Sequence, residues 1–262
     1  SSSDAALLLH HLVGYLERGG FIATLEQTPA DAIQLLQEYA SRTVAMDVVE
    51  RYDVKNPRLA SLFLARCMAS SGRELSVNKV YNEFKSRQIS VSRNTLSDLL
   101  EYYEDAYLLF SVPEFTRSLA NNTRSASKVY AVDPAMFGAF SPASALDHGQ
   151  RLETAVFNAL RRRTPAVRPG SVCRLLIKDK NKSHEVDFVA GDALLMQAYG
   201  LIQVSVDMTS EKTREREIAA LDAAMAQFDL GESVIVTMDE QADIPCKHGV
   251  VHVVPAWKWL LA

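Results

Sequence analysis

The residues with the clearest chemical potential are two carboxylates in the C-terminal half of the chain, Glu153 and Asp187. Apolar residues recur at helical spacing over residues 152–163, and Glu153 falls inside that apolar face. A carboxylate buried there costs several kcal/mol unless another group pairs with it. The alternation over residues 185–190 predicts a strand with Glu185 and Asp187 on one side. Both acids are therefore candidates for a site.

A second strand, predicted over residues 201–207, supplies further polar groups. Its alternation places Gln203, Ser205 and Asp207 on one side, opposite the apolar residues. If the two strands are neighbours and the helix of Glu153 lies over the same face, the polar side chains converge.

This order resembles the restriction-type nuclease fold with the PD-(D/E)xK motif. The resemblance implies that the Asp and the acid of the last motif hold Mg²⁺, which lowers the pKa of a water, while the Lys orients or activates that water. Glu153 and Asp187 match the pattern, and the step of sixteen residues from Asp187 to Gln203 has the expected size.

The last motif departs from that pattern, because the chain reads Gln203-Val204-Ser205 where the family has an acid, a spacer and Lys. A neutral amide is a weak ligand for a hard cation, and a hydroxyl cannot replace an ammonium group. We therefore expect a degenerate site, namely Glu153, Asp187, Gln203 and Ser205 in a nuclease-like fold that no longer cleaves.

Two alternatives stay open for these residues. The first is an active, metal-dependent DNA nuclease with a rearranged site, in which Glu153 and Asp187 bind Mg²⁺. Glu185 or Asp207 would then act as a further ligand, and the lysine would have moved to Lys178 or Lys180. The second is a structural role, in which Glu153 and Asp187 are hydrogen-bonded or paired with an arginine.

A different kind of binding site is suggested by the first half of the chain. Helical patterns over residues 58–70, 77–86 and 93–107 precede two apolar, strand-like segments at 108–112 and 128–132. Three helices followed by a hairpin in this order predict a winged helix-turn-helix. Ser92 is the expected N-cap of the third helix.

Basic residues in this region could contact nucleic acid. The start of the third helix would meet base edges and the loop of the hairpin would lie near phosphates; the candidates are Arg93, Asn94, Arg117, Arg124 and Lys128. A second basic block over residues 161–182 carries eight Lys and Arg against one acid, Asp179, and adds Arg161, Arg162 and Arg163. Acids on the third helix, Asp98, Glu101, Glu104 and Asp105, argue against its deep insertion into a major groove, so a structural or protein-docking role is an equal alternative.

Other motifs are absent or weak. No Gly-x-x-x-x-Gly-Lys-Ser/Thr loop occurs, so we expect this chain alone to bind and hydrolyse no ATP. The histidines of the pair His10-His11 and of His248-x-x-x-His252 have no acidic or cysteine partner at metal spacing in the sequence.

Composition limits the classes of protein that remain. The chain has 262 residues, 48% hydrophobic residues and a formal net charge of −4, which excludes a disordered chain and a uniformly basic one. Its three cysteines lie far apart, which argues against a disulfide framework and a thiolate zinc site. The apolar stretches fall short of the ~20 residues that span a bilayer. We expect a cytoplasmic protein without a membrane partner.

The elements that must position these residues form three expected segments. Residues 1–55 read as a helical segment and residues 56–140 as the winged helix-turn-helix. Residues 141–262 read as helix, strands, helix and strands, which predicts a mixed sheet flanked by helices, of the α+β or α/β class, with a boundary near residues 141–149.

Four landmarks together resemble one family: Glu17-Arg18-Gly19-Gly20-Phe21, the run from Leu99 to Leu108, Lys128-Val129-Tyr130-Ala131-Val132-Asp133, and Glu153 with the segments at 185–188 and 201–205. The order is similar to the C-terminal region of bacterial and archaeal AAA-type ATPases, a domain of unknown function built from a winged helix and a restriction-nuclease-like fold. The resemblance implies that a preceding ATPase domain binds ATP and Mg²⁺. The absence of an initial methionine fits that expectation.

That resemblance implies a non-catalytic targeting or regulatory role for the chain. We expect it to bind DNA weakly and without sequence preference, or to dock the ATPase domain or another protein partner. No cofactor is expected in this part of the protein, and Mg²⁺ would be needed only if the nuclease alternative holds.

Overall fold

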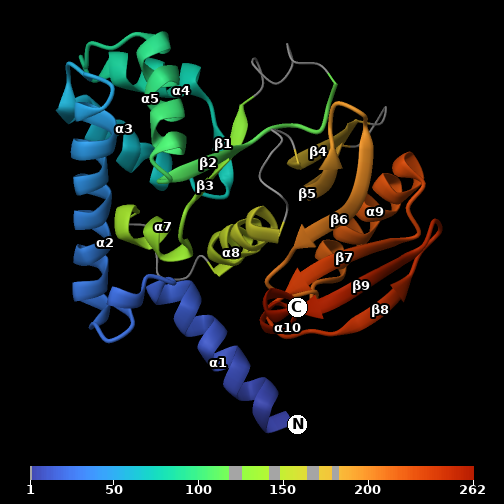
Figure 1. Cartoon of the computed structure of the whole chain (residues 1–262). Helices are drawn as coiled ribbons and strands as arrows, with labels where there is room; N and C mark the ends of the chain where they lie inside the picture. The colour runs from blue at the N-terminus through green and yellow to red at the C-terminus, as the bar shows by residue number, and fades with distance from the viewer. Residues whose placement is uncertain (1, 118–125, 142–147, 164–170, 179–182) are drawn as a thin grey trace. The chain divides into compact units, whose positions relative to one another are not determined.

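The computed structural model describes residues 2–117, 126–141, 148–163, 171–178 and 183–262, and these form two compact units (Figure 1). The first, called the helical unit below, comprises Tyr15–Ser111 and Ala126–Thr154. The second, the sheet unit, comprises Ser1–Gly14, Val112–Ser125 and Ala155–Ala262. Of the boundary expected near residues 141–149, residues 142–147 lie outside the described part of the chain.

The helical unit is built from capped helices around a small sheet. Its helical elements are the end of α1 (Ser2–Arg18), η1 (Ile22–Thr24), α2 (Pro29–Thr43), the π-helical η2 (Val44–Glu50), α3 (Pro57–Met68), α4 (Val77–Ser86), α5 (Arg93–Asp105), α7 (Pro134–Phe140) and the start of α8 (His148–Arg163). The side chains of Thr28 and Ser92 accept hydrogen bonds from the backbone of Asp31 and Thr95. These contacts confirm Ser92 as the N-cap of α5.

Three strands complete this unit: β1 (Arg73–Leu75), β2 (Leu109–Val112) and β3 (Ser127–Ala131), in the order β1-β3-β2. The strand-like segments predicted near residues 108–112 and 128–132 are β2 and β3. The sequence did not indicate β1, which pairs antiparallel with β3 through Arg73 and Val129. A strand of three residues is too short to show an alternation of its own.

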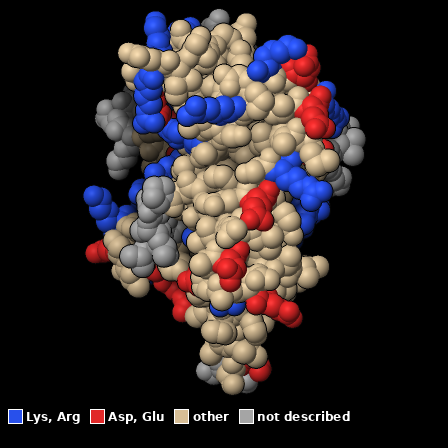
Figure 2. Space-filling model, turned by 90° about the vertical axis from the view of Figure 1, so that its left-hand side faces the viewer, with Lys and Arg blue, Asp and Glu red and all other residues tan. Residues whose placement is uncertain are grey.

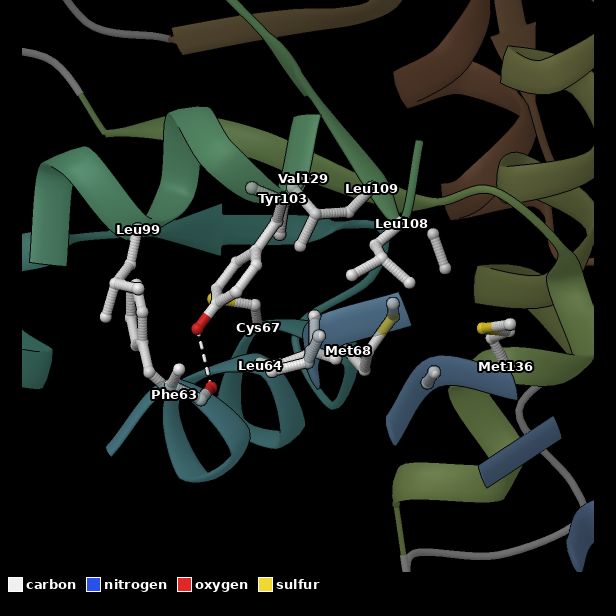
Figure 3. Close-up of a cluster of buried hydrophobic side chains, with 14 of the residues drawn as sticks. Phe63, Leu64, Cys67, Met68, Leu99, Tyr103, Leu108, Leu109, Val129 and Met136 are labelled. Atoms are coloured by element: carbon white, nitrogen blue, oxygen red, sulfur yellow. Dashed lines mark hydrogen bonds between the residues drawn. The ribbon is translucent and has the colours of Figure 1, made fainter. Parts of the chain in front are cut away.

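The core of the helical unit joins α3, α5 and the sheet (Figure 3). Phe63, Leu64 and Met68 of α3 pack with Leu99 and Tyr103 of α5. The hydroxyl of Tyr103 is fully buried and donates a hydrogen bond of 2.5 Å to the carbonyl of Ala60. Burying each such side chain contributes about 1.5–3 kcal/mol, and the bond satisfies the one polar atom that Tyr103 brings into the core.

The sheet unit contains a mixed sheet of six strands, and the sequence pattern predicted a mixed sheet in this part of the chain. Its strands are β4 (Val172–Lys178), β5 (Ser183–Asp192), β6 (Gln197–Val204), β7 (Glu232–Thr237), β8 (Ala242–Pro245) and β9 (Val250–Pro255), in the order β4-β5-β6-β7-β9-β8. Strands β4, β5 and β6 are antiparallel neighbours, whereas β6, β7 and β9 run parallel. Helix α9 (Glu211–Phe228) packs on β5 and β6, and α10 (Ala256–Leu261) follows β9.

The strand predicted over residues 201–207 differs from the observed one in its limits. Strand β6 begins at Gln197 and ends at Val204, so Ser205 and Asp207 lie in the connection to α9. Leu201 packs beside Leu221 and Met225 of α9 in the apolar core. Within the described residues, none of the helices is both long and apolar enough to cross a bilayer.

Candidate functional site

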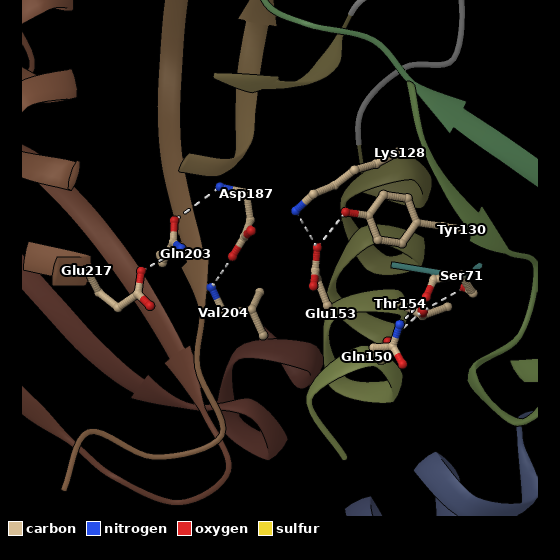
Figure 4. A network of polar contacts seen from close by, with 10 residues as sticks. All are labelled: Ser71, Lys128, Tyr130, Gln150, Glu153, Thr154, Asp187, Gln203, Val204 and Glu217. Carbon is tan, nitrogen blue, oxygen red and sulfur yellow. Dashed lines mark hydrogen bonds and ion pairs between the residues drawn. The ribbon is translucent and has the colours of Figure 1, made fainter. Parts of the chain in front are cut away.

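Asp187 stands at an irregularity in the pairing of β4 with β5. Cys173 pairs with Val189 and Leu175 with Val186, so Arg174 alone faces both Asp187 and Phe188. Such a bulge re-aims side chains, and bulges are common next to functional sites. The Asp187 side chain is turned towards β6, where its Oδ2 accepts a 3.0 Å hydrogen bond from the backbone N–H of Val204 (Figure 4).

Gln203 is held at both ends of its side chain. Its Oε1 accepts a hydrogen bond of 3.1 Å from the backbone N–H of Asp187, and its Nε2 donates one of 2.7 Å to Oε2 of Glu217 (Figure 4). Gln203 is 6% exposed, and Asp187 is 7% exposed. The structure thus brings these two predicted residues together, and both serve as links between elements.

Glu217 is a further member of this cluster, contributed by α9. Burial raises the pKa of its carboxyl, and contact with Arg216 and the hydrogen bond from Gln203 oppose that rise. Arg216 Nε donates to Oε1 of Glu217 at 3.2 Å. The negative charge of Asp187 acts in the same direction as burial and favours the protonated form of Glu217.

Ser205 and Asp207 lie beyond the end of β6 and have hydrogen-bond partners in the connection to α9. Ser205 Oγ donates a hydrogen bond of 2.8 Å to the backbone carbonyl of Asp207. The side-chain and backbone donors of Thr209 lower the pKa of the exposed Asp207 carboxyl. The position that would carry the nuclease lysine is therefore part of a local turn.

The residues of the rearranged site are placed separately. Glu185 is half-buried in β5, opposite Leu176, whereas Lys178 is exposed at the end of β4. Asp207 lies beyond the end of β6, and Lys180 lies outside the described residues.

The donor set around Asp187 does not fit Mg²⁺. The cation takes oxygen ligands in octahedral geometry, whereas Asp187 accepts a backbone N–H and the amide of Gln203 is engaged at both ends. Among the described residues, no group of three or more His, Cys, Asp or Glu side chains is placed to hold a metal ion. No catalytic step through a metal follows from this geometry.

Glu153 belongs to the helical unit and has partners there. Its Oε1 accepts hydrogen bonds from Lys128 Nζ at 3.1 Å and from the hydroxyl of Tyr130 at 2.6 Å (Figure 4). The side chains of Lys128 and Glu153 are 11% and 15% exposed. Lys128, expected near phosphates, therefore lies in β3 as half of a largely buried ion pair.

The other predicted nucleic-acid contacts are distributed over both units. Arg93 and Asn94 are exposed at the start of α5 in the helical unit. In the sheet unit, Nη2 of Arg117 donates a hydrogen bond of 3.4 Å to the backbone carbonyl of Leu195. The last turn of α8 contains Arg161, Arg162 and Arg163. The guanidinium carbon of Arg163 lies over the ring of Trp259, 4.4 Å from the ring centroid. Arg124 lies outside the described residues.

A junction near the end of α1 was not predicted as a site. Asp133 caps α7 through a 2.8 Å hydrogen bond from the N–H of Ala135, and its other oxygen accepts the N–H of Gly20 at 2.7 Å. Arg151 of α8 donates to the carbonyl of Leu16 at 2.8 Å. The Gly-Gly pair was the available signal, because a backbone that approaches a side chain closely favours glycine.

The histidines near the C-terminus have acidic partners in space. His248 Nδ1 lies 3.1 Å from Asp222, and His252 Nδ1 lies 2.7 Å from Asp243. These aspartates come from α9 and β8, and no regular sequence spacing could indicate them.

One part of the chain matches the model of a known family. The family described as "Domain of unknown function (DUF8612)" matches residues 9–147, just over half of the chain. The chain belongs to this family. The DUF8612 match includes Gly20 and Asp133, whereas Asp187 and Gln203 lie beyond it.

Two curated proteins are similar to this DUF8612 chain, and both are uncharacterized. The protein MJ1544 of Methanocaldococcus jannaschii is 31% identical over 268 residues, which cover 100% of this chain and 58% of that protein. A protein of Haemophilus influenzae is 23% identical over 179 residues, covering 68% of this chain and 42% of that protein. The chain thus spans about half the length of these relatives. No solved structure matches it.

Proposed function

We propose that this chain is the non-catalytic C-terminal region of an AAA-type ATPase and attaches that enzyme to nucleic acid. In this proposal the helical unit contains a winged helix, formed by α3, α4, α5 and the three-stranded sheet. Residues 141–262, with Glu153 of α8 and the six-stranded sheet, are a degenerate member of the PD-(D/E)xK nuclease fold. The relatives extend well beyond the matched region, which accommodates an ATPase domain.

The observation that carries the non-catalytic part is the hydrogen bonding of Gln203. Its amide joins the backbone of Asp187 to the carboxylate of Glu217. A residue that replaces a metal ligand and bonds its neighbours in this way stabilises the fold where a nuclease would hold Mg²⁺. Losing a ligand and a cation would each cost several kcal/mol of transition-state stabilisation, and ~1.4 kcal/mol is a factor of ten in rate.

Within each unit, residues of the landmarks that suggested the ATPase family bond to one another, which supports their use as a signature. Gly20 bonds to Asp133 in the helical unit, and Lys128 pairs with Glu153. In the sheet unit, Asp187 bonds to the Gln203-Val204 segment. Residues that depend on each other for hydrogen bonds form a coherent set, whereas isolated short motifs would not.

The nucleic-acid part rests on the exposed cations of both units, Arg93 at the start of α5 and Arg162 at the end of α8 among them. Exposed Lys and Arg bind phosphates with a strong dependence on salt. The competing hypothesis is a module that docks a protein partner and ignores nucleic acid. Fluorescence anisotropy with labelled duplex DNA at low and higher salt separates them, because the docking module would show no binding at low salt.

Cleavage tests the non-catalytic part. We expect no degradation of plasmid or single-stranded DNA with Mg²⁺ or Mn²⁺ and no ATP hydrolysis by the purified chain. Asp187→Ala should change folding or binding and should have no effect on catalysis. Cutting by the unmodified protein that disappears in Asp187→Ala would establish the nuclease alternative. Activity gained only by combining Gln203→Glu with Ser205→Lys would support a degenerate nuclease site.

A further inference from the structure

One face of α4 has the composition of a surface for nucleic acid. Asn78, Tyr81, Asn82 and Lys85 occupy positions i, i+3, i+4 and i+7 of this helix and therefore form one stripe. Asn78, Asn82 and Lys85 are exposed, and Tyr81 is half-buried. The opposite side of α4, with Val80 and Phe84, is buried in the core of the helical unit. Amides, a phenol and an ammonium group are all donors that proteins use towards phosphates.

Arg93 of α5 adds a second cation to the stripe. Its guanidinium lies over the ring of Tyr81, 5.0 Å from the ring centroid. A guanidinium held on an aromatic face keeps its charge and its donors, and its conformational freedom is already reduced before a phosphate binds. Binding a phosphate then costs less side-chain entropy than it would for a free arginine.

The acidic residue of α4 does not oppose this charge. Glu83 lies on another side of the helix, where its carboxylate pairs with Arg66 Nε at 3.1 Å and with Arg87 Nη2 at 3.4 Å. Two guanidinium groups thus neutralise it locally. Figure 2, which views the molecule from the left-hand side of Figure 1, shows Lys and Arg side chains interspersed with Asp and Glu side chains on that face.

Helix α5 has the opposite character along most of its exposed side. Asp98, Glu101 and Asp105 follow Arg93 and Asn94 at helical spacing, and all three acids are exposed. Carboxylates on that side would repel the phosphates of a groove into which α5 inserted. The charge therefore changes sign along α5, and its first turn alone continues the stripe of α4.

We propose that α4 and the first turn of α5, and not the length of α5, form the contact with nucleic acid. The site comprises Asn78, Tyr81, Asn82, Lys85 and Arg93, and it binds the phosphodiester backbone of duplex DNA without reading bases. This inference deepens the proposed function and rests on it. It names the surface and the chemistry that the binding uses.

Replacing the two cations tests the surface. Lys85→Gln and Arg93→Gln should each weaken binding of a labelled duplex about eightfold near 0.1 M salt, because each phosphate contact contributes ~0.9 to the salt slope. The double variant should lose about sixtyfold, and its slope should fall by ~1.8. Both residues are exposed, so thermal unfolding should be unchanged.

A single-stranded probe of the same length distinguishes the two forms of DNA and should bind more weakly than the duplex.

A matched control separates a local site from net charge. The pair Lys212→Gln and Arg214→Gln removes two exposed cations from α9 in the sheet unit and should leave affinity unchanged. Equal losses of DNA affinity in both double variants would contradict the proposed surface. An unchanged affinity and an unchanged salt slope in the Lys85→Gln/Arg93→Gln double variant would contradict it as well. In either case the proposed function would stand. If the unmodified protein fails to bind DNA at low salt, the proposed function fails and the inference falls with it.

Discussion

Gln203 and Glu217 are joined by a buried hydrogen bond of 2.7 Å between the side-chain amide of β6 and the carboxylate of α9. The neutral amide is what makes this contact favourable. An acid at position 203, as in an intact nuclease motif, would place a second carboxylate against Glu217, whereas Gln203 supplies a donor there. Gln203 therefore connects α9 to the sheet through a hydrogen bond that an ionised acid at this position could not donate.

Gln203→Glu should destabilise the protein most at neutral and higher pH. The new carboxylate would face Glu217 in a buried setting, and an uncompensated buried charge costs about 3 kcal/mol or more. Protonation of either acid removes the repulsion, so the loss should shrink as pH falls. Urea unfolding at several pH values measures it. Gln203→Met is the control, because it removes the hydrogen bonds without charge; a loss from Gln203→Glu that did not vary with pH would contradict the predicted repulsion.

Glu217 itself should make stability depend on pH in the unmodified protein. Burial raises the pKa of this carboxyl in the folded state. The stabilising contribution of the protonated group is complete below the ordinary pKa and is lost as pH rises through the raised one. Comparing urea unfolding of the unmodified protein with Glu217→Gln across that window isolates the effect, which the variant should lack. Glu215→Gln, an exposed neighbour, should retain it.

Much of the fold was predictable because local signals and packing agree. Ser92 marks a helix start, and the apolar periodicities of α3, α4 and α5 identify the faces that pack in the core. The mixed sheet followed from strands on both sides of α9. Strand β8 was not predicted, since Ala242–Pro245 is short, ends in Pro and has mostly exposed residues.

The candidate site was predictable only in part. Asp187 and Gln203 are brought together because neighbouring strands β5 and β6 pair at that point. Ser205 was expected beside them, but β6 ends at Val204, and no feature of the sequence gave that limit. Glu217 was missed because its exposed neighbours in α9 give the helix a weak apolar pattern, so a buried carboxylate cannot be distinguished from a solvated one.

The Lys128–Glu153 pair should behave as a buried ion pair. Lys128→Met removes the cation from the largely buried Glu153 carboxylate and should cost about 3–5 kcal/mol. The double variant with Glu153→Gln should be more stable than the sum of the single losses indicates. A double-mutant cycle in chemical denaturation measures that coupling. Lys79→Met, at a position of α4 outside the core, should change stability by about 0.5 kcal/mol or less. Additive losses would show that the pair contributes nothing specific.

Gly19 should tolerate no side chain, because the junction with Asp133 leaves no space. Its φ is +82°, and an added Cβ would lie 2.2 Å from Oδ1 of Asp133. Gly19→Ala should therefore cost about 1–3 kcal/mol and disturb the cap of α7, which uses that same oxygen. Gly14→Ala is the matched control: Gly14 lies within α1 with nothing near its Cβ position, and alanine there should add about 0.5–1 kcal/mol of stability. Thermal and urea unfolding of both variants decide the matter, and a Gly19→Ala protein as stable as the unmodified one would show that Asp133 does not hold the end of α1.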